Sequence, residues 1–381
     1  MPKIAFISRT NPVDIEKYSG TTYHIHEALA NQDFDIYDIY KLNERYWTYL
    51  RWKRKIYKDL FGKRFLIDRS PLRAYGYAKE LKKQINGHDI DVIFSDSSLT
   101  ISTLKTEIPI VFYTDSTFAG MVDYYDGFSN LSRKTVKDGM RFEKMALKNC
   151  SKAIYTSKWA ADSAIKDYGA DPAKVEIIPY GANFQVEKSQ EEMQDIIGAK
   201  TFDKCRLLFV GKDWGRKGGN LAVNVVKKLN EIGIPSTLSI VGCEPEIDPS
   251  IQDFVEVHGY LNKAKKEDLD RMVDLYHRAH YFILPTYAEC FGIAFAEASS
   301  FGLPNLALDT GGVASAVTDG KSGKLFDISA TADDFVSFIK PNFTDQNAYS
   351  ALAESSYREY LQRLNWNASG KRLSEVISSL I

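Results

Sequence analysis

The chain lacks the long apolar runs and paired cysteines that would place it in a membrane or outside the cell. No stretch of its 381 residues approaches the ~18 uninterrupted apolar residues that a membrane-spanning helix needs. The four cysteines are scattered, without a C-x-x-C pair, as in proteins of reducing compartments. The first residues alternate like a strand and show no basic-then-apolar leader. We therefore expect a cytoplasmic protein, attached to a membrane at most peripherally, at its inner face.

A charge surplus and a histidine cluster are also missing. The net charge of −1 argues against a nucleic-acid partner. His24 and His26 would diverge on a helix, and His277 and His280 would share a face without a carboxylate motif. Three D-x-D triplets arise readily by chance and are interpreted as surface charge: Asp33–Asp35, Asp89–Asp91 and Asp268–Asp270. We expect no metal and no cofactor.

A dinucleotide-binding signature is absent as well. Such a site needs G-x-G-x-x-G directly after the first strand. The segment from Ser8 to Gly20 contains a single glycine. This absence disfavours a dehydrogenase, the first alternative for a chain of this type.

What the chain does contain is a regular alternation of short apolar runs and longer helical patterns. Several runs are continuous in Val, Ile, Leu or Phe, as strands buried in parallel sheets are. We expect strands at Ile4–Ser8, Asp91–Ser95, Pro109–Thr114, Ala153–Thr156, Arg206–Gly211, Thr237–Gly242, Phe254–His258, Tyr281–Leu284 and Asn305–Leu308. Strands separated by helices form right-handed β-α-β units, which predicts an α/β fold with doubly wound sheets.

This pattern begins twice, which predicts two Rossmann-like domains. Residues 1–185 form the first and residues 186–346 the second, with a polar stretch near the boundary. The length of the chain is sufficient for two domains. Ligands of such sheets bind at the carboxyl ends of the strands.

The turn after the run Tyr281–Leu284 is the most informative segment. It contains Glu289, and an Ala-rich helical pattern with Glu297 begins directly behind it. Amides at the start of a helix can hold an anion while carboxylates bind hydroxyls of the same ligand. Glu297 interrupts an apolar pattern, where charged residues are rarely buried without a partner. A phosphorylated sugar, or a nucleotide that carries one, fits this combination.

A second loop carries positive charge. Gly211, Lys212, Arg216 and Lys217 lie in residues 211–219, between an expected strand and an expected helix. Glycine permits close backbone approach to a ligand, and the bases can neutralise a diphosphate. Such a loop would stabilise the charge that develops on a diphosphate leaving group.

In order and spacing these segments resemble the retaining glycosyltransferases of family 4, which have the GT-B fold. The resemblance rests on Glu289 and Glu297, on the basic loop 211–219, and on the turns 301–304, 309–313 and 318–323. It implies two Rossmann-like domains that face a cleft. It also implies that the C-terminal helices, within residues 347–381, cross back to the first domain.

The resemblance further implies roles for single residues. Glu297 would bind the ribose hydroxyls of a nucleotide, and Glu289 would lie near the transferred sugar. The expected catalytic residues are Glu289, Lys217, Arg216 and Asp115. The expected donor-binding residues are Gly20, Thr21, Gly211, Lys212, Arg216, Lys217, Glu289, Phe291, Gly292, Ile293 and Glu297.

At three positions the chain departs from the family pattern. Lys212 stands where the family usually has arginine, so either Lys212 or Arg216 could fill that role. Ser19 replaces the first glycine of the Gly-Gly loop. Asp115 lies where many members have histidine, and it could contact a sugar or acceptor, or merely cap the next helix.

The resulting prediction is a hexosyltransferase that uses a nucleotide-diphosphate sugar and retains anomeric configuration, without a metal. The acceptor would be a glycan or lipid-linked hydroxyl, in polysaccharide, glycolipid or glycoconjugate synthesis. It would bind mainly to the first domain, where residues 1–185 hold 28 Lys and Arg against 23 Asp and Glu, while the rest holds 21 against 27. A two-domain nucleotide-sugar or sugar-binding protein without catalysis is the alternative.

Residues 45–64 mix bases with aromatic residues. Such a segment could lie on an anionic membrane or line an acceptor groove. It could equally be an ordinary amphipathic helix whose basic side chains extend to solvent.

Overall fold

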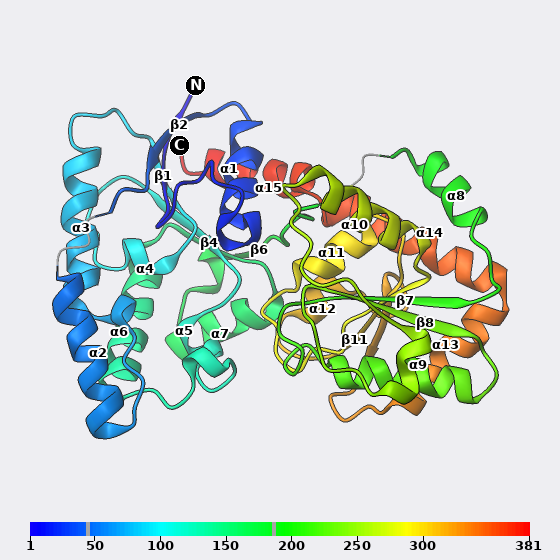
Figure 1. Cartoon of the computed structure of the whole chain (residues 1–381). Helices are drawn as coiled ribbons and strands as arrows, with labels where there is room; N and C mark the ends of the chain where they lie inside the picture. Colours follow the sequence, from blue (N-terminus) through cyan, green and yellow to red (C-terminus); the bar gives the residue numbers. More distant parts are fainter. Residues whose placement is uncertain (43–45, 185–187) are drawn as a thin grey trace. The chain divides into compact units, whose positions relative to one another are not determined.

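The chain folds into two compact units. The computed structural model describes residues 1–42, 46–184 and 188–381. The N-terminal unit comprises Met1–Pro179 together with Ser369–Ile381, and the C-terminal unit comprises Tyr180–Ala368. The boundary expected between residues 185 and 186 lies outside the described residues. Figure 1 shows the elements of each unit.

A six-stranded parallel sheet forms the centre of the N-terminal unit. Its order is β2-β1-β3-β4-β5-β6. The strands are β1 (Lys3–Ile7), β2 (Asp35–Ile39), β3 (Val92–Ser95), β4 (Ile110–Thr114), β5 (Lys152–Tyr155) and β6 (Val175–Ile177). All ladders are parallel, and the four inner strands are almost entirely buried. Continuous apolar runs therefore correspond to the inner strands, as expected for a sheet covered on both faces.

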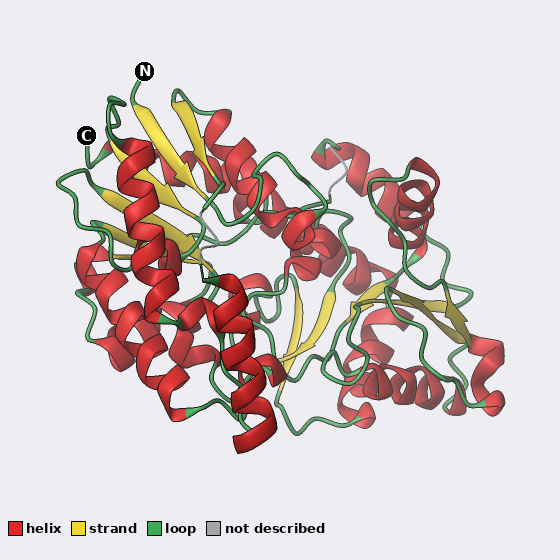
Figure 2. Ribbon diagram, turned by 60° about the vertical axis from the view of Figure 1, so that its left-hand side comes forward, coloured by secondary structure: helices red, strands yellow, loops and turns green. Residues whose placement is uncertain are grey.

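Helices connect these strands and cover the sheet (Figure 2). They are α1 (Thr21–Ala30), α2 (Trp47–Phe61), α3 (Pro71–Ile85), α4 (Ser98–Ile101), α5 (Phe118–Met121), α6 (Arg133–Asn149) and α7 (Lys158–Tyr168). The chain runs from β1 outward to β2 and then returns past β1 to β3. The direction of winding thus reverses between β1 and β3, and in doubly wound sheets ligands bind at such a reversal point.

The C-terminal unit repeats this architecture. Its sheet has the order β12-β11-β10-β7-β8-β9, again with parallel ladders. The strands are β7 (Cys205–Val210), β8 (Ser236–Val241), β9 (Val255–Val257), β10 (Tyr281–Ile283), β11 (Asn305–Leu308) and β12 (Gly323–Phe326). The helices are α8 (Gln190–Gly198), α9 (Gly219–Glu231), α10 (Lys266–Arg278), α11 (Ile293–Ser299), α12 (Val313–Ala316), α13 (Ala332–Thr344) and α14 (Gln346–Arg363). Here the winding reverses between β7 and β10.

The last helix, α15 (Trp366–Ser378), begins in the C-terminal unit and ends in the N-terminal unit. Residues 369–381 belong to the N-terminal unit, whereas α14 and the rest of the segment from residue 347 to 368 stay with the C-terminal unit. Gly370 packs so closely against α1 that a Cβ there would lie 2.6 Å from the carbonyl oxygen of Ala28. The chain therefore returns to the first unit about twenty residues later than the segment 347–381 predicted.

Three strands, β2, β6 and β12, were not expected from the sequence. Each lies at the edge of its sheet and is less buried than the inner strands. Edge strands face solvent on one side, so they lack the continuous apolar run that identifies an inner strand. Among the described residues, no helix combines the length and apolar character required to cross a membrane.

Candidate active site

In the C-terminal unit, the basic loop after β7 lies directly against the loop after β10. Gly218 has a left-handed backbone, with φ at 75°, and a Cβ there would lie 2.0 Å from the carbonyl oxygen of Pro285. The amide of Tyr287 donates to the carbonyl oxygen of Arg216 at 2.8 Å. Glycine is required for this close approach. The two loops follow the strands between which the winding reverses, so they occupy the usual ligand position of this fold class.

Glu289 brings together the positive side chains of the basic loop. Its carboxylate forms an ion pair with the Lys217 ammonium, and Arg216 Nη1 lies 3.6 Å from the same oxygen. Arg216 also donates to the carbonyl oxygen of Ala288 at 2.6 Å, and its Nε donates to Asp213 at 3.3 Å. The side chains of Lys217 and Glu289 are 14% and 13% exposed. Glu289, Lys217 and Arg216 are the three catalytic candidates that the sequence analysis names in this unit. In the structure Lys217 and Arg216 both face Glu289.

Lys212 lies elsewhere in the same loop. Its Nζ is 4.7 Å from the centroid of the Tyr260 ring. Within the described part of the chain it makes no ion pair, whereas Arg216 faces Glu289. Of the two candidates for the family arginine, Arg216 is the one that contacts the glutamate.

The remaining donor-binding candidates of this unit shape the loop before α11. Gly292 precedes the helix with φ at 89°, and a Cβ there would lie 2.5 Å from the Phe295 ring. Ile293 is the first residue of α11, which has seven residues. Phe291 is buried and packs against Tyr180 with ring centroids 5.8 Å apart. These residues fix the path of the chain between the two glutamates.

Glu297 is 4% exposed and pairs with a lysine that the sequence did not single out. Lys263 Nζ lies 2.5 Å from Glu297 Oε1 and 5.4 Å from the centroid of the Phe184 ring. A buried carboxylate requires a partner, so a base was to be expected near Glu297. A separation of 34 residues gives no local signal for which base it is.

In the N-terminal unit, the point where the winding reverses carries a second carboxylate that the sequence did not single out. Asp96 directly follows β3, and its Oδ2 accepts hydrogen bonds from Ser8 Oγ at 2.8 Å and Thr22 Oγ1 at 2.9 Å. Burial raises the pKa of Asp96, and these two hydrogen bonds oppose the rise. Gly20, with φ at 81°, precedes α1, and Thr21 is the first residue of that helix. The predicted residues Gly20 and Thr21 therefore adjoin Asp96. The sequence signal that could have identified Asp96 is the polar triplet Ser95-Asp96-Ser97 at the end of a buried strand.

Asp115 follows β4 in the N-terminal unit and does not cap the next helix. The N-cap of α5 is Thr117, whose hydroxyl accepts a hydrogen bond from the amide of Gly120 at 3.0 Å. Asp115 accepts a hydrogen bond from Ser116 Oγ at 3.3 Å. The capping explanation for Asp115 therefore does not hold.

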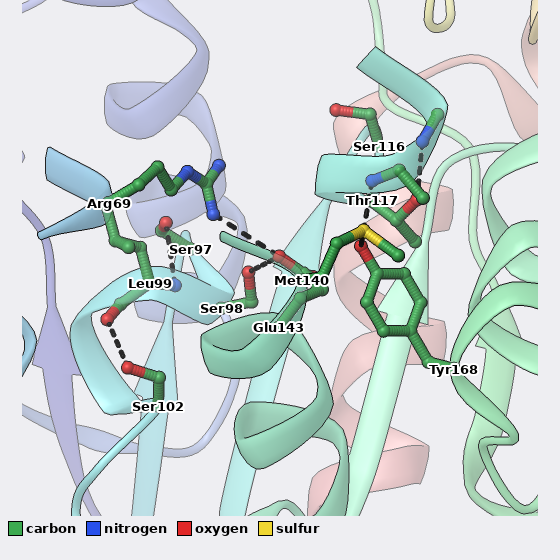
Figure 3. Close-up of polar contacts among 12 residues, drawn as sticks. Arg69, Ser97, Ser98, Leu99, Ser102, Ser116, Thr117, Met140, Glu143 and Tyr168 are labelled. Carbon is green, nitrogen blue, oxygen red and sulfur yellow. Dashed lines mark hydrogen bonds and ion pairs between the residues drawn. The ribbon is translucent and has the colours of Figure 1, made fainter. Parts of the chain in front are cut away.

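In the N-terminal unit, a buried ion pair joins Arg69 and Glu143 (Figure 3). Glu143 on α6 accepts hydrogen bonds from Ser98 Oγ at 2.9 Å and from Arg69 at 3.4 Å. The Arg69 guanidinium also lies 4.8 Å from the centroid of the Phe118 ring. Burial raises the pKa of Glu143, and Arg69 opposes the rise. Because Ser98 and Phe118 begin α4 and α5, this pair links the starts of two helices that follow β3 and β4.

Two of the three D-x-D triplets lie at the amino ends of strands, and the third contacts the segment next to Lys263. Asp35 begins β2 and pairs with Lys3, and Asp91 accepts a hydrogen bond from the Lys3 amide just before β3. Both are at the amino ends of the strands. Asp268 accepts a hydrogen bond from the Asn262 amide. The described residues contain no group of three or more His, Cys, Asp or Glu side chains arranged to hold a metal ion.

Two family models match the chain. Residues 20–186 match a model described as glycosyltransferase family 4, and residues 204–340 match one described as glycosyl transferases group 1. The D-inositol 3-phosphate glycosyltransferase of Acidothermus cellulolyticus is 31% identical over 189 residues, which cover 46% of this chain and 42% of the relative. The chain spans about half the length of the curated relatives it matches.

Solved structures share the fold over the whole chain. Sucrose-phosphate synthase from Thermosynechococcus elongatus has a TM-score of 0.67 at 16% identity, with 100% of this chain and 99% of that chain covered. Anabaena HepE, solved with UDP-glucose, has a TM-score of 0.64 at 15% identity, with 99% of each chain covered. The two matched ranges together include most of the chain, and both units have the sheet order described above. The chain therefore belongs to glycosyltransferase family 4 and has the GT-B fold.

Proposed function

We propose that this protein transfers a sugar, as a hexosyltransferase, from a nucleotide-diphosphate donor to an acceptor hydroxyl. The contact of Lys217 and Arg216 with Glu289 carries this proposal. It combines a cationic surface for a diphosphate with a carboxylate for sugar hydroxyls, at the point where the winding of the sheet reverses. Glu297, buried within α11, which begins directly after the loop of Glu289, would bind the ribose hydroxyls.

The positive side chains would act on the leaving group. When the glycosidic bond breaks, negative charge grows on the departing diphosphate, and preorganised donors stabilise that charge most. Arg216 is preorganised by its bonds to Ala288 and Asp213. Lys217 pairs with Glu289, so a bound diphosphate would compete with this carboxylate for the ammonium group. Hydrogen bonds donated by the sugar hydroxyls to the Glu289 carboxylate would then compensate for part of the ion pair that this carboxylate loses.

Retention of anomeric configuration is part of the proposal and is supported by family membership. Metal independence is supported by the bases around Glu289, which can supply positive charge at the diphosphate. Transfer in the presence of EDTA tests it. Complete loss in EDTA, with recovery on adding Mg²⁺ or Mn²⁺, would contradict it.

The comparisons indicate which substrates to test first. UDP-glucose is the ligand named for the HepE structure, and D-inositol 3-phosphate is the acceptor implied by the names of the curated relatives. A glycan or a lipid-linked hydroxyl is the broader acceptor class that we propose. A cytoplasmic location is supported by the free thiols of Cys150, Cys205, Cys243 and Cys290.

The first experiment is a thermal-shift screen with UDP, GDP and ADP, because a ligand that binds the folded state raises the melting temperature. The matching sugar nucleotides are then incubated with each acceptor, and nucleotide release and product are measured. Product configuration is read from the anomeric coupling constant.

Lys217→Met is the test variant and Lys227→Met, on the exposed face of α9, is the matched control. We expect turnover in wild type and in the control, and loss in Lys217→Met. Binding of a sugar nucleotide without hydrolysis or transfer to any acceptor would favour the alternative of a non-catalytic sugar-nucleotide-binding protein.

A further inference from the structure

Helix α2 (Trp47–Phe61) has two apolar faces, and only one of them packs on the protein. Leu50 is the single fully buried residue of the helix. It joins Phe65 and Ile67 in a small core, against which Trp47 and Tyr57 also pack. This small core accounts for the attachment of α2 to the N-terminal unit, at whose outer side the helix is seen in Figure 1.

The other apolar face is exposed. Tyr49, Trp52, Ile56 and Leu60 follow one another at spacings of three, four and four residues, which aligns them along one side of an α-helix. Tyr49 is 50% exposed, Trp52 61% and Leu60 74%, while Ile56 is half-buried. The rings of Tyr49 and Trp52 lie 6.5 Å apart. We call these four residues the outer stripe of α2.

Positive charge accompanies this stripe. From Arg51 to Arg64 the sequence holds seven bases and one acid, Asp59. Arg51, Arg54, Lys55 and Lys58 are exposed, and none of them has an ion pair with another described residue. At 100° per residue, Lys55 lies about 60° from Trp52 on the flank of the outer stripe, whereas Arg51 lies further round the helix and Lys58 lies on the side away from the stripe.

This combination differs from an ordinary surface helix. An amphipathic domain helix places its apolar residues on the packed face and its charges outside. Here exposed aromatic and aliphatic residues line a side of the helix other than that of Leu50, Lys55 borders them, and further exposed bases without an ion pair follow round the helix. A nucleic acid would engage the bases but leave Leu60 and Ile56 in water, and a neutral protein partner would not need the bases.

We propose that the outer stripe of α2 binds the surface of a membrane that contains anionic lipids. Trp52, Tyr49 and Leu60 enter the boundary between headgroups and acyl chains, where aromatic side chains are favoured. Lys55 contacts lipid phosphates, and Arg51 and Lys58 lie within about one helix diameter, roughly 10 Å, of the surface. Each base near an anionic surface adds up to about fivefold to the partition coefficient. The interaction is independent of the proposed glycosyl transfer, since it uses none of the residues of the candidate active site.

Vesicle sedimentation with the full chain tests this. Phosphatidylcholine vesicles are compared with vesicles in which about a third of the lipid is phosphatidylglycerol, because the proposed attraction is electrostatic. We expect binding to the anionic vesicles that weakens with added salt. Arg51→Gln, Lys55→Gln and Lys58→Gln combined should lower the partition coefficient by between about fivefold, the share of Lys55 alone, and about a hundredfold. The combination Lys79→Gln, Lys82→Gln and Lys83→Gln removes three exposed bases of α3 and should bind like wild type.

The apolar part is tested separately. Trp52→Ser with Leu60→Ser should lose vesicle binding, whereas Ile232→Ser, at another exposed apolar site, should not. All five tryptophans are described, and Trp52 is the one that is largely exposed. Its fluorescence should shift to shorter wavelength on addition of anionic vesicles, and this shift should be absent in Trp52→Phe. Circular dichroism and melting temperature establish that each variant is folded.

Four results would overturn the proposal. The first three are no binding to anionic vesicles, equal binding to neutral vesicles, and loss of binding in the α3 variant to the same extent as in the α2 variant. Binding that persists in Trp52→Ser with Leu60→Ser would also overturn it, because the bases alone would then suffice, as in a site for a soluble polyanion.

Discussion

The ion pair between Lys217 and Glu289 leads to an unusual prediction for nucleotide binding. A diphosphate at the basic loop must take the Lys217 ammonium from Glu289. The substitution Glu289→Gln removes the competing charge and keeps the shape of the side chain. The bare nucleoside diphosphate should therefore bind more tightly to this variant than to wild type. The diphosphate of the sugar nucleotide should gain in the same way, but the sugar should lose its contact with the Glu289 carboxylate, so the affinity for the sugar nucleotide should rise less or fall.

The scale of this gain in affinity is taken from the distance between Glu289 and its second cationic partner, Arg216. The separation of 3.6 Å between Arg216 Nη1 and Glu289 Oε2 corresponds to a gross attraction of ~5 kcal/mol at an effective dielectric constant of about 20. Desolvation cancels most of such a gross energy when side chains are as buried as Lys217 and Glu289. We expect a net gain of ~1.4 kcal/mol for the bare diphosphate, which is about tenfold in Kd.

Isothermal titration calorimetry with the bare and the sugar-linked diphosphate measures both affinities. Glu231→Gln, an exposed glutamate at the end of α9, is the matched control. The reasoning would be refuted by equal weakening of both ligands in Glu289→Gln. Weaker binding of the bare diphosphate alone would show that Glu289 supports the phosphate site rather than competes with it.

Four further predictions follow from the same structure. Lys217→Ala should lower kcat by ~10²–10³, the scale for one donor to a developing charge; a rise in KM alone would make the loop a binding surface only. Glu297→Gln should weaken binding of the nucleoside diphosphate more than it slows turnover, because ribose contacts are similar in the ground and transition states, and unchanged affinity would contradict the ribose assignment. Asp115→Asn should leave the melting temperature unchanged, since Thr117 caps α5, and should lower activity; activity within about twofold of wild type would remove Asp115 from the site. Burial lowers the pKa of Lys200 from 10.5 to about 7. Above pH 7 the unfolded chain therefore binds one proton more than the folded protein, and the free energy of unfolding should rise by ~2 kcal/mol from pH 7 to 9. Denaturant unfolding at both pH values checks this, and the rise should be absent in Lys200→Met.

The inner strands of both sheets were predictable because burial on two faces leaves a continuous apolar run. β2 illustrates where this fails: two aspartates interrupt its sequence Asp-Ile-Tyr-Asp-Ile, and it is largely half-buried. β12 fails for a similar reason, since it lies at an edge and contains Gly323 and Lys324. Edge position is a property of the whole sheet, which no local window of sequence contains.

The candidate site was partly predictable. Lys217 and Glu289 each stand in a loop with a recognisable pattern, and parallel order in the sheet brings the loops together. Lys263 and Asp96 were not singled out because their significance depends on tertiary neighbours. Lys263 forms an ion pair with Glu297, 34 residues away in the sequence, and Asp96 accepts hydrogen bonds from Ser8 and Thr22. The role of Asp115 could not be settled either, because capping by Thr117 depends on where α5 begins.

The N-terminal unit is built from two separate segments of the chain, Met1–Pro179 and Ser369–Ile381, and this has a consequence for biosynthesis. Its sheet and most of its helices are encoded before residue 180, yet Leu373 and Ile377, fully buried on α15, are added only after the C-terminal unit has been made. At usual rates of translation this interval lasts roughly 10 to 40 s. The unit that emerges first from the ribosome is thus the last to be finished, and in the meantime the α1 surface around Ala28 lacks its cover. A nascent chain stalled before residue 369 should therefore expose apolar surface on its older half, where chaperones would be expected to bind.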